Sequence, residues 1–243
     1  MRVMRAFVEQ PLAPGMELAL PEDAAAHLVR VLRLREGDGC VLFNGDGHDH
    51  PATIMAVGKR EARVRIDGRV AVDNESPLRI TLVQGLARGE KMDLILQKAT
   101  ELGVAAFVPV ASERSEVRLD PDRVDKRLAH WRSVVRAACE QSGRARVPEI
   151  APPLPLGAAL AGLPAGVRFL LDPAATRAID ASALTGGACV LAIGPEGGWS
   201  PRDRGQLRDT GFIGLRLGPR ILRTETAGLA AIAVLQALHG DFA

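Results

Sequence analysis

The pattern of apolar and polar positions over residues 1–74 predicts short strands, tight turns and one helix. Apolar residues follow helical spacing from Ala24 to Leu32, directly after a Pro-Glu-Asp start. The segment 44–47, Asn-Gly-Asp-Gly, lies between two apolar runs and is a strong hairpin signal. In Ala62–Ile66 apolar positions alternate with arginines, as in a strand with one solvated face. Together these elements predict a small β-barrel domain.

Beyond the polar stretch 72–77, which contains a proline, apolar runs of strand length alternate with helical segments. This stretch marks the predicted boundary between a first domain, residues 1–74, and a second domain, residues 75–243. The predicted strands of the second domain are 79–82, 105–110, 167–171, 189–193 and 212–217, and its main helices are 90–102, 121–141 and 224–239. Short apolar strands separated by helices are typical of a parallel sheet covered by helices, so the sequence predicts an α/β fold.

Composition restricts the functional classes without selecting one. The formal net charge is +2, so binding to a polyanion would depend on local clusters of basic residues. The three cysteines lie far apart and no Cys/His cluster has metal-ligand spacing, so we expect neither a disulfide framework nor a metal site. His48 and His50 share a predicted hairpin tip but have no further ligands beside them. No segment approaches the roughly 20 apolar residues of a membrane span, and the N-terminus has no apolar signal core, which predicts a cytoplasmic protein.

A glycine-rich loop follows the predicted strand that ends at Ile193. Its sequence from Gly194 is Gly-Pro-Glu-Gly-Gly-Trp, and Ser200 with Pro201 begins the next helix. Glycines there allow the backbone to approach a ligand closely, and ligands of open α/β sheets bind at the carboxyl ends of strands. A tight turn without a ligand is the alternative that these residues leave open. Neither the phosphate-loop pattern nor the dinucleotide-binding pattern is present.

A second loop, Gly218–Arg223, follows the last predicted strand. Thr224 is expected to cap the helix that begins there, and Glu225 in its first turn favours the helix dipole. Capping does not explain Arg220 and Arg223, which flank an apolar pair. Two arginines beside apolar side chains predict the lip of a small-ligand site, with the charges facing an anionic partner.

Two C-terminal segments carry the most specific sequence of the chain. They are Ile-Gly-Pro-Glu-Gly-Gly-Trp-Ser at 193–200 and Leu-Gly-Pro-Arg-Ile-Leu-Arg-Thr-Glu-Thr-Ala at 217–227. Together they resemble the RsmE family of ribosomal RNA uridine N3-methyltransferases, within the SPOUT superfamily. Weaker matching pieces lie in the same order along nearly the whole chain, at 27–38, 84–93, 98–104, 113–115 and 138–144.

The resemblance implies a fold and a cofactor that periodicity does not reveal. It implies a PUA-like β-barrel RNA-binding domain at residues 1–74, a SPOUT domain with a C-terminal trefoil knot at residues 75–243, and a homodimer. It also implies that S-adenosyl-L-methionine binds in the knot, in an apolar slot with backbone hydrogen bonds for the adenine ring. By resemblance, the cofactor-binding residues are Leu171, Asp172, Ile193, Gly194, Pro195, Gly197, Gly198, Leu217, Gly218, Ile221, Leu222 and Thr226.

The implied reaction is methylation of N3 of a uridine in 16S ribosomal RNA. N3 must lose its proton, so a cation such as Arg223 would stabilise the developing anion, and a carboxylate, Glu196 or Glu225, would accept the proton. N3 lies on the pairing edge, so the base must be unpaired or flipped out. The expected phosphate contacts are Arg30, Arg33, Arg88, Lys91, Arg114, Arg136 and Arg144, although each is also compatible with an ordinary solvated charge.

Two other functions remain open from the sequence. Another SPOUT activity, such as ribose 2′-O-methylation of RNA, would use the same cofactor loops. A non-catalytic RNA-binding assembly factor would not need the cofactor. Because only 3% of the residues are aromatic, base stacking should contribute little, and recognition should depend on RNA shape within the small ribosomal subunit.

Overall fold

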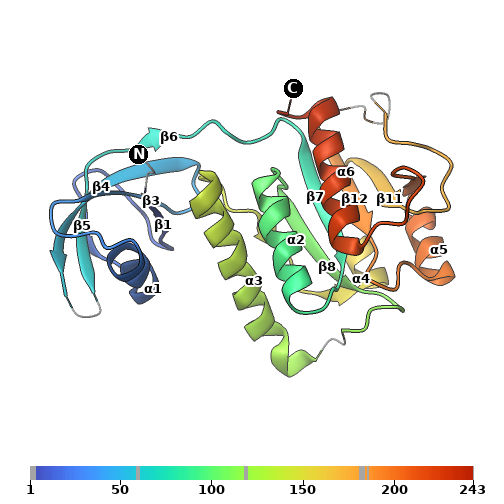
Figure 1. Cartoon of the computed structure of the whole chain (residues 1–243), viewed down its shortest axis with the longest axis horizontal. Helices are drawn as coiled ribbons and strands as arrows, with labels where there is room; N and C mark the ends of the chain where they lie inside the picture. The colour runs from blue at the N-terminus through green and yellow to red at the C-terminus, as the bar shows by residue number, and fades with distance from the viewer. Residues whose placement is uncertain (1–3, 59–60, 118–119, 181–183, 185, 243) are drawn as a thin grey trace. The chain divides into compact units, whose positions relative to one another are not determined.

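The computed structural model describes residues 4–58, 61–117, 120–180, 184 and 186–242 (Figure 1). It divides into two compact units. The first unit consists of residues 1–75 together with 136–147, and the second of residues 76–135 together with 148–243. The chain therefore passes between the units three times, after residues 75, 135 and 147.

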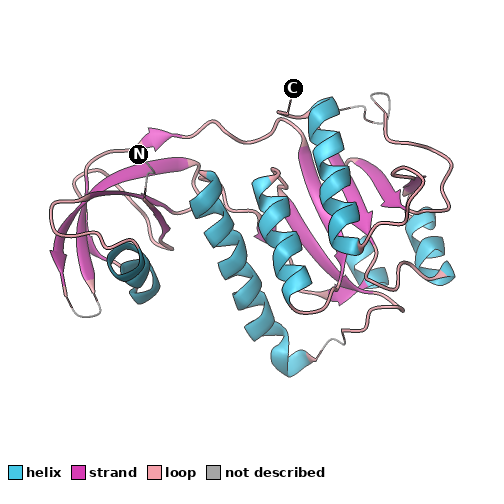
Figure 2. Ribbon diagram, viewed as in Figure 1, coloured by secondary structure: helices cyan, strands magenta, loops and turns pink. Residues whose placement is uncertain are grey.

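A six-stranded sheet forms the first unit (Figure 2). The order is β1-β3-β4-β5-β2 with β6 on β4; β1 and β3 are parallel and the other pairs antiparallel. The predicted hairpin is confirmed, because β3 and β4 pair across residues 44–47 with Leu42 opposite His50. Ile54 and Val64 are fully buried in the core of this unit. The strands are β1 (Arg5–Phe7), β2 (Glu17–Ala19), β3 (Gly39–Phe43), β4 (His48–Val57), β5 (Ala62–Ile66) and β6 (Val70–Ala71).

The predicted helix of the first unit is only partly an α-helix. Glu22–Ala25 form α1, and Ala26–Val31 continue it as a π-helix, η1. Leu28 is fully buried, but Val31 is 67% exposed, because the wider turn moves it off the inner face that a 3.6-residue period predicts. Arg33 follows with a φ of 59°, the one positive value for a non-glycine residue in the described part of the chain.

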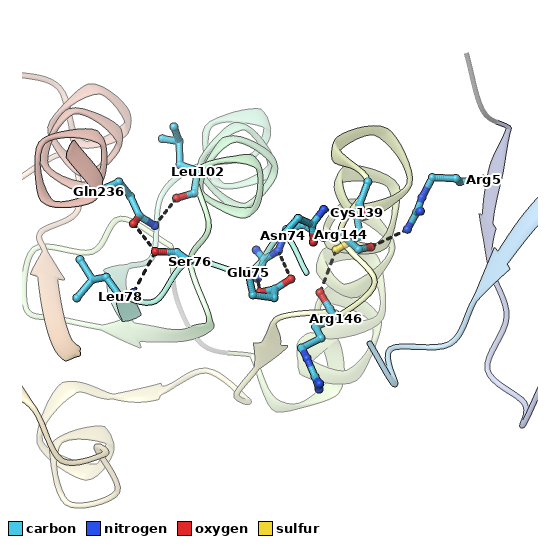
Figure 3. Close-up of polar contacts among 11 residues, drawn as sticks. Arg5, Asn74, Glu75, Ser76, Leu78, Leu102, Cys139, Arg144, Arg146 and Gln236 are labelled. Carbon is cyan, nitrogen blue, oxygen red and sulfur yellow. Dashed lines mark hydrogen bonds and ion pairs between the residues drawn. The ribbon is translucent and has the colours of Figure 1, made fainter. Parts of the chain in front are cut away.

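The end of α3 (Pro121–Ser142) packs with the first unit, although the predicted boundary assigns it to the second domain. We call this segment, Arg136–Val147, the α3 tail. Its Arg144 is 4% exposed, and its guanidinium donates from Nε to Oε1 of Glu75 at 3.0 Å. The Arg144 carbonyl accepts a hydrogen bond from Arg5 at 3.0 Å (Figure 3). Contacts between residues distant in sequence thus place the α3 tail in the first unit.

Seven parallel strands form the sheet of the second unit, in the order β10-β8-β7-β12-β11-β13 with β9 beside β8. This confirms the predicted parallel α/β fold. Helices α2 (Glu90–Glu101) and α6 (Thr224–His239) lie side by side on one face (Figure 2), and α4 (Leu156–Leu160) and α5 (Pro201–Asp209) pack into the core of the other. The strands are β7 (Arg79–Gly85), β8 (Ala106–Ala111), β9 (Glu149–Ile150), β10 (Leu154–Pro155), β11 (Val167–Leu171), β12 (Ala188–Ile193) and β13 (Ile213–Leu215).

The carboxyl ends of the central strands meet at one edge of this sheet. Leu171 at the end of β11 pairs with Leu215 of β13, and Ile193 at the end of β12 pairs with Gln84 of β7. The loops that follow β11, β12 and β13 therefore start next to one another. This edge is where parallel α/β sheets usually bind ligands.

None of the helices in the described ranges is both long and apolar enough to span a bilayer. All three cysteines are buried and free, and burial raises the pKa of Cys139 and of Cys189 to about 12. Among the described residues, no group of three His, Cys, Asp or Glu side chains is arranged to hold a metal ion.

Candidate functional site

A cavity of about 710 Å³ lies at the edge where β11, β12 and β13 end. Three segments line it, 171–173, 193–199 and 215–225, together with Lys91, Arg114, Arg204 and Ala227. Of the residues predicted to bind a cofactor, all line this cavity except Thr226, which is exposed on α6. The structure thus brings residues from three separate parts of the chain into one site.

The loop after β12, residues 194–199 and called the first loop below, is packed too closely to accept side chains at key glycines. A Cβ on Gly197 would lie 3.0 Å from the Cβ of Arg114, and one on Gly85 of β7 would lie 2.5 Å from the backbone nitrogen of Pro195. Arg114 Nη1 also donates a hydrogen bond to the Gly197 carbonyl at 3.2 Å. Such close packing fixes the backbone of the first loop in the protein alone.

A buried hydrogen-bond network ties the first loop to α6 and β7. The Thr224 hydroxyl donates to the carbonyl of Gly194 at 2.6 Å and accepts from the Gln84 amide at 3.0 Å. Gln84 is fully buried and Thr224 is 6% exposed. The expectation that Thr224 caps α6 is wrong: Arg223 is the N-cap residue and makes no side-chain capping bond. Gln84 is not among the predicted site residues, although a glutamine in a mostly apolar strand indicates a buried group that needs partners.

The start of α5 fixes the far end of the first loop, and this helix begins at Ser200 and Pro201 as predicted. The Ser200 hydroxyl accepts the N–H of Asp203 at 3.0 Å, and the Asp203 carboxylate accepts the N–H of Ser200 at 2.9 Å. With Pro201 at the first helical position, this reciprocal pair forms a capping box.

The loop after β13, residues 217–223 and called the second loop below, has far less protein around it. Gly218 has a φ of +69°, and no atom lies within 4 Å of the position of its Cβ. Ile221 lines the cavity but is 84% exposed, so the protein covers little of its side chain. Arg220 and Arg223 are exposed and line the cavity, in the position of the predicted lip.

Glu196 of the first loop is held by two donors. Its Oε1 accepts hydrogen bonds from the backbone N–H of Arg88 at 3.1 Å and from the Lys91 ammonium at 3.3 Å. Burial acts to raise the pKa of Glu196, but these contacts outweigh it, and the pKa lies below its ordinary value. Glu196 is therefore a stabilised carboxylate that orients Lys91.

Two further acidic residues line the cavity. Asp172 is 3% exposed and lies 3.9 Å from the Arg204 guanidinium and 3.6 Å from that of Arg208. Glu225 differs, because its Oε2 is buried and accepts no hydrogen bond from the described residues.

Three of the basic residues predicted to contact RNA lie near this cavity in the second unit. Lys91 and Arg114 line it. The backbone of Arg88 contacts Glu196, while its exposed guanidinium forms an ion pair with Glu116.

The other four lie in the first unit, and they differ in exposure. Arg30 and Arg33 are exposed at the end of η1 and just after it. Arg136 pairs with Glu9 at 3.2 Å and covers the ring of Phe7 at 4.4 Å. Arg144 is only 4% exposed and is paired with Glu75, so it offers little surface to RNA, contrary to the expectation that it contacts RNA.

Comparison with known proteins agrees with this architecture. The chain matches a family model described as an RNA methyltransferase domain over residues 74–236 and one described as an RNA methyltransferase PUA domain over residues 20–67. It is 33% identical to ribosomal RNA small subunit methyltransferase E of Mycobacterium bovis, over 98% of this chain and 93% of the relative. The protein of that name from Neisseria gonorrhoeae, solved bound to S-adenosyl methionine, superposes with a TM-score of 0.92 at 43% identity, over 99% of this chain and 100% of that one. A Legionella pneumophila methyltransferase solved with bound SAM superposes with a TM-score of 0.94 at 37% identity, over 99% and 100% of the two chains.

A parallel α/β domain with a cavity at its strand ends, in one chain with a PUA domain, defines the class of RNA methyltransferases. Within that class, the chain belongs to the RsmE family, the ribosomal RNA small subunit methyltransferases E. The resemblance carried by the two C-terminal segments is confirmed.

Proposed function

We propose that the chain transfers a methyl group from S-adenosyl-L-methionine to N3 of a uridine in 16S ribosomal RNA. The observation that carries the proposal is the cavity at the strand ends, which collects the predicted residues from three segments. Relatives across the whole chain are named for methylation of small-subunit ribosomal RNA, and two similar structures hold this compound.

The residues of the cavity fit an adenosyl ligand. A volume of about 710 Å³ lies within the range of small-molecule sites. Ile193, Leu217 and Leu222 supply apolar surface for the adenine ring, and the glycines of the first loop leave backbone groups accessible. The buried Oε2 of Glu225 needs a donor or a cation that the described residues do not supply. When bound, S-adenosyl-L-methionine supplies a strongly electrophilic methyl group.

Arg223 is the residue proposed to act on the uridine. Its exposed guanidinium stands on the cavity lining at the start of α6, where it can stabilise negative charge on the uracil ring as N3 loses its proton. Glu196 is a poor candidate for the proton acceptor, because Arg88 and Lys91 already stabilise its ionised form. Arg114 and Lys91 are the proposed phosphate contacts beside the cavity.

A SPOUT-type trefoil knot is proposed for the C-terminal part of the second unit. After β13, the N–H of Arg216 donates to the carbonyl of Arg177 at 2.8 Å, and Arg216 also bridges to Ala178 in parallel. The chain leaving β13 thus runs along the segment that follows β11 before it turns back to α6. This path of the chain supports a knot, in which one segment passes through the loop formed by another. Most folds have no such connection.

We also propose that the chain forms a homodimer. Its proposed substrate is the small ribosomal subunit, in the cytoplasm. Leu94 on α2 and Leu238 on α6 are each 40% exposed, and these two helices lie side by side. Leu94 lies near the start of α2 and Leu238 near the end of α6, so each helix offers an exposed apolar side chain, which supports a two-fold contact between copies. Gel filtration with light scattering would measure the mass directly, and a monomer at micromolar concentration would refute this part.

Nucleoside mass spectrometry tests the reaction. The full-length chain is incubated with S-adenosyl-L-methionine and with either small ribosomal subunits or naked 16S RNA from cells that lack the enzyme. We expect 3-methyluridine, formed faster on the subunit. A 2′-O-methyl nucleoside would replace the proposal with the ribose reaction, and no methylation together with no cofactor binding would indicate a non-catalytic RNA-binding factor.

A further inference from the structure

The charges around the cavity are strongly unequal. Basic residues suit RNA phosphates and a ligand carboxylate. The methyl donor of the proposed function also has a permanent positive charge on its sulfur, which an excess of basic residues disfavours unless an acid stands close to it. The lining includes six basic residues, Lys91, Arg114, Arg204, Arg216, Arg220 and Arg223, and three acidic ones, Asp172, Glu196 and Glu225.

Two of the three acids are already compensated by the protein. The Asp172 carboxylate lies within 4 Å of two guanidinium groups, those of Arg204 and Arg208. Glu196 is held by the Lys91 ammonium and a backbone N–H. Glu196 Oε2 is buried without a donor as well, but Glu196 is held through its Oε1. Glu225 is the exception, because its buried Oε2 has no donor and no ion pair joins its carboxylate to a described residue.

The neighbour of Glu225 fixes its place in the cavity. The 2.6 Å hydrogen bond from Thr224 to the Gly194 carbonyl holds the first turn of α6 against the first loop. Glu225 follows directly and lines the cavity. A carboxylate that lines a cavity without a protein partner has lost part of its hydration, and a cationic ligand in the cavity would offset that cost.

We propose that Glu225 is the cation-recognition residue of this cavity and that its carboxylate favours the sulfonium donor over the demethylated product, whose sulfur is neutral. This inference rests on the proposed function. It assigns Glu225 a different task from the proton acceptor that the sequence also allowed. A carboxylate is a weak base toward a uracil N–H, whereas its attraction to a permanent cation requires no proton transfer.

Calorimetric titration with S-adenosylmethionine and with S-adenosylhomocysteine tests the proposal. The two compounds share the adenosine, the ammonium and the carboxylate groups, and they differ in the methyl group and the charge on sulfur. In Glu225→Gln, which keeps the shape of the side chain, we expect the affinity for S-adenosylmethionine to fall about tenfold or more. The affinity for S-adenosylhomocysteine should change less than about threefold, so the ratio of the two dissociation constants shifts.

Glu90→Gln is the matched control, because Glu90 is an exposed acid in the first turn of α2 and does not line the cavity. It should leave both affinities unchanged. Thermal unfolding without ligand verifies that Glu225→Gln is folded. If it is not, Glu225→Asp, which keeps the charge but shortens its reach, should lower the preference for the sulfonium.

Three results separate the competing explanations. Equal losses for both ligands would overturn the proposal and point to the shared ammonium group. Unchanged affinities with lost methylation would also overturn it and return Glu225 to the role of proton acceptor. A wild-type chain that binds neither ligand would instead refute the proposed function itself.

Discussion

The first loop and the second loop line the same cavity but are held in opposite ways. The first is fixed by the close approach of Gly197 to Arg114, by the Thr224 hydrogen bond and by the capping box of α5, although its Gly198 has open space. The second has open space around Gly218 and an almost fully exposed Ile221. A ligand therefore meets one wall that the protein has already ordered and one wall with much less support.

This difference determines where binding free energy is gained and lost. Contacts with an ordered wall cost little conformational entropy, whereas contacts with a poorly supported loop include the cost of ordering it. Changes in the first loop should therefore destroy a preformed surface. Changes in the second loop should alter affinity without altering the stability of the free protein.

The largest effect is expected from Gly197→Val. The new side chain would collide with Arg114, whose Cβ lies 3.0 Å from the position of the first added carbon. Overpacking of this kind costs about 1–3 kcal/mol. Because the first loop must move to relieve it, calorimetry should record a loss of about 5- to 150-fold in affinity for S-adenosylmethionine. RNA affinity should persist.

The matched control for this change is Gly39→Val, at a glycine of the first unit with no atom within 4 Å of its Cβ position. It should leave cofactor affinity intact. Equal affinity of Gly197→Val and the wild type would mean that the first loop is not a rigid wall.

A smaller effect is expected from Thr224→Val, which keeps the shape of the side chain but removes the bridging hydroxyl. The part-buried Gly194 carbonyl would lose its donor and the buried Gln84 amide one of its acceptors, at a cost of about 1–3 kcal/mol in the free energy of unfolding. Urea denaturation measures this, with the exposed Thr226→Val in the same helix as the control. A loss of under about 0.3 kcal/mol would show that the network does not hold the first loop.

Ile221→Ser tests the second loop, where we expect a change in affinity without a change in stability. Because Ile221 is 84% exposed, the free energy of unfolding should stay within about 0.5 kcal/mol of the wild type. Affinity for S-adenosylmethionine should nevertheless fall severalfold, since an ordered second loop would bring this side chain against the ligand. Unchanged affinity would mean that the second loop remains open in the complex.

The smallest effect concerns acid stability. A carboxyl whose pKa is lowered by folding stabilises the protein above its unfolded-state pKa, and this contribution disappears as the pH falls through the native pKa. The stability difference between the wild type and Glu196→Gln should therefore be present near neutral pH and shrink below about pH 4.5. Urea midpoints measured between pH 3 and pH 7 check this, and a constant difference would contradict it.

The helices and strands and the position of the site could be predicted from the local pattern of apolar and polar residues. The structure gives β5, β11 and α6 the predicted bounds, because their apolar runs and flanking turn residues are unambiguous. The cavity could be expected as well, because parallel strands end at one edge and both the first loop and the second loop follow such strands.

Features that depend on distant partners could not be predicted in this way. The π-helical turn Ala26–Val31 has ordinary helical spacing in sequence, and only packing selects the wider turn. Thr224 satisfied every local rule for a cap, yet its hydroxyl bonds Gly194, 30 residues away. The sequence around Arg144 likewise predicts a surface charge. Its burial depends on contacts with Glu75 and Arg5, which lie far away in the sequence.

The α3 tail has a practical consequence for dissecting this protein. A fragment ending at residue 75 would lack the segment that supplies Arg144, and Glu75 would lose its partner. A fragment beginning at residue 76 would contain the α3 tail without the strands that it packs against. Cys139, which is buried in the full chain, would then be exposed to solvent. A single cut therefore yields neither unit intact, and an expression fragment of the first unit would need residues 136–147 joined to residues 1–75.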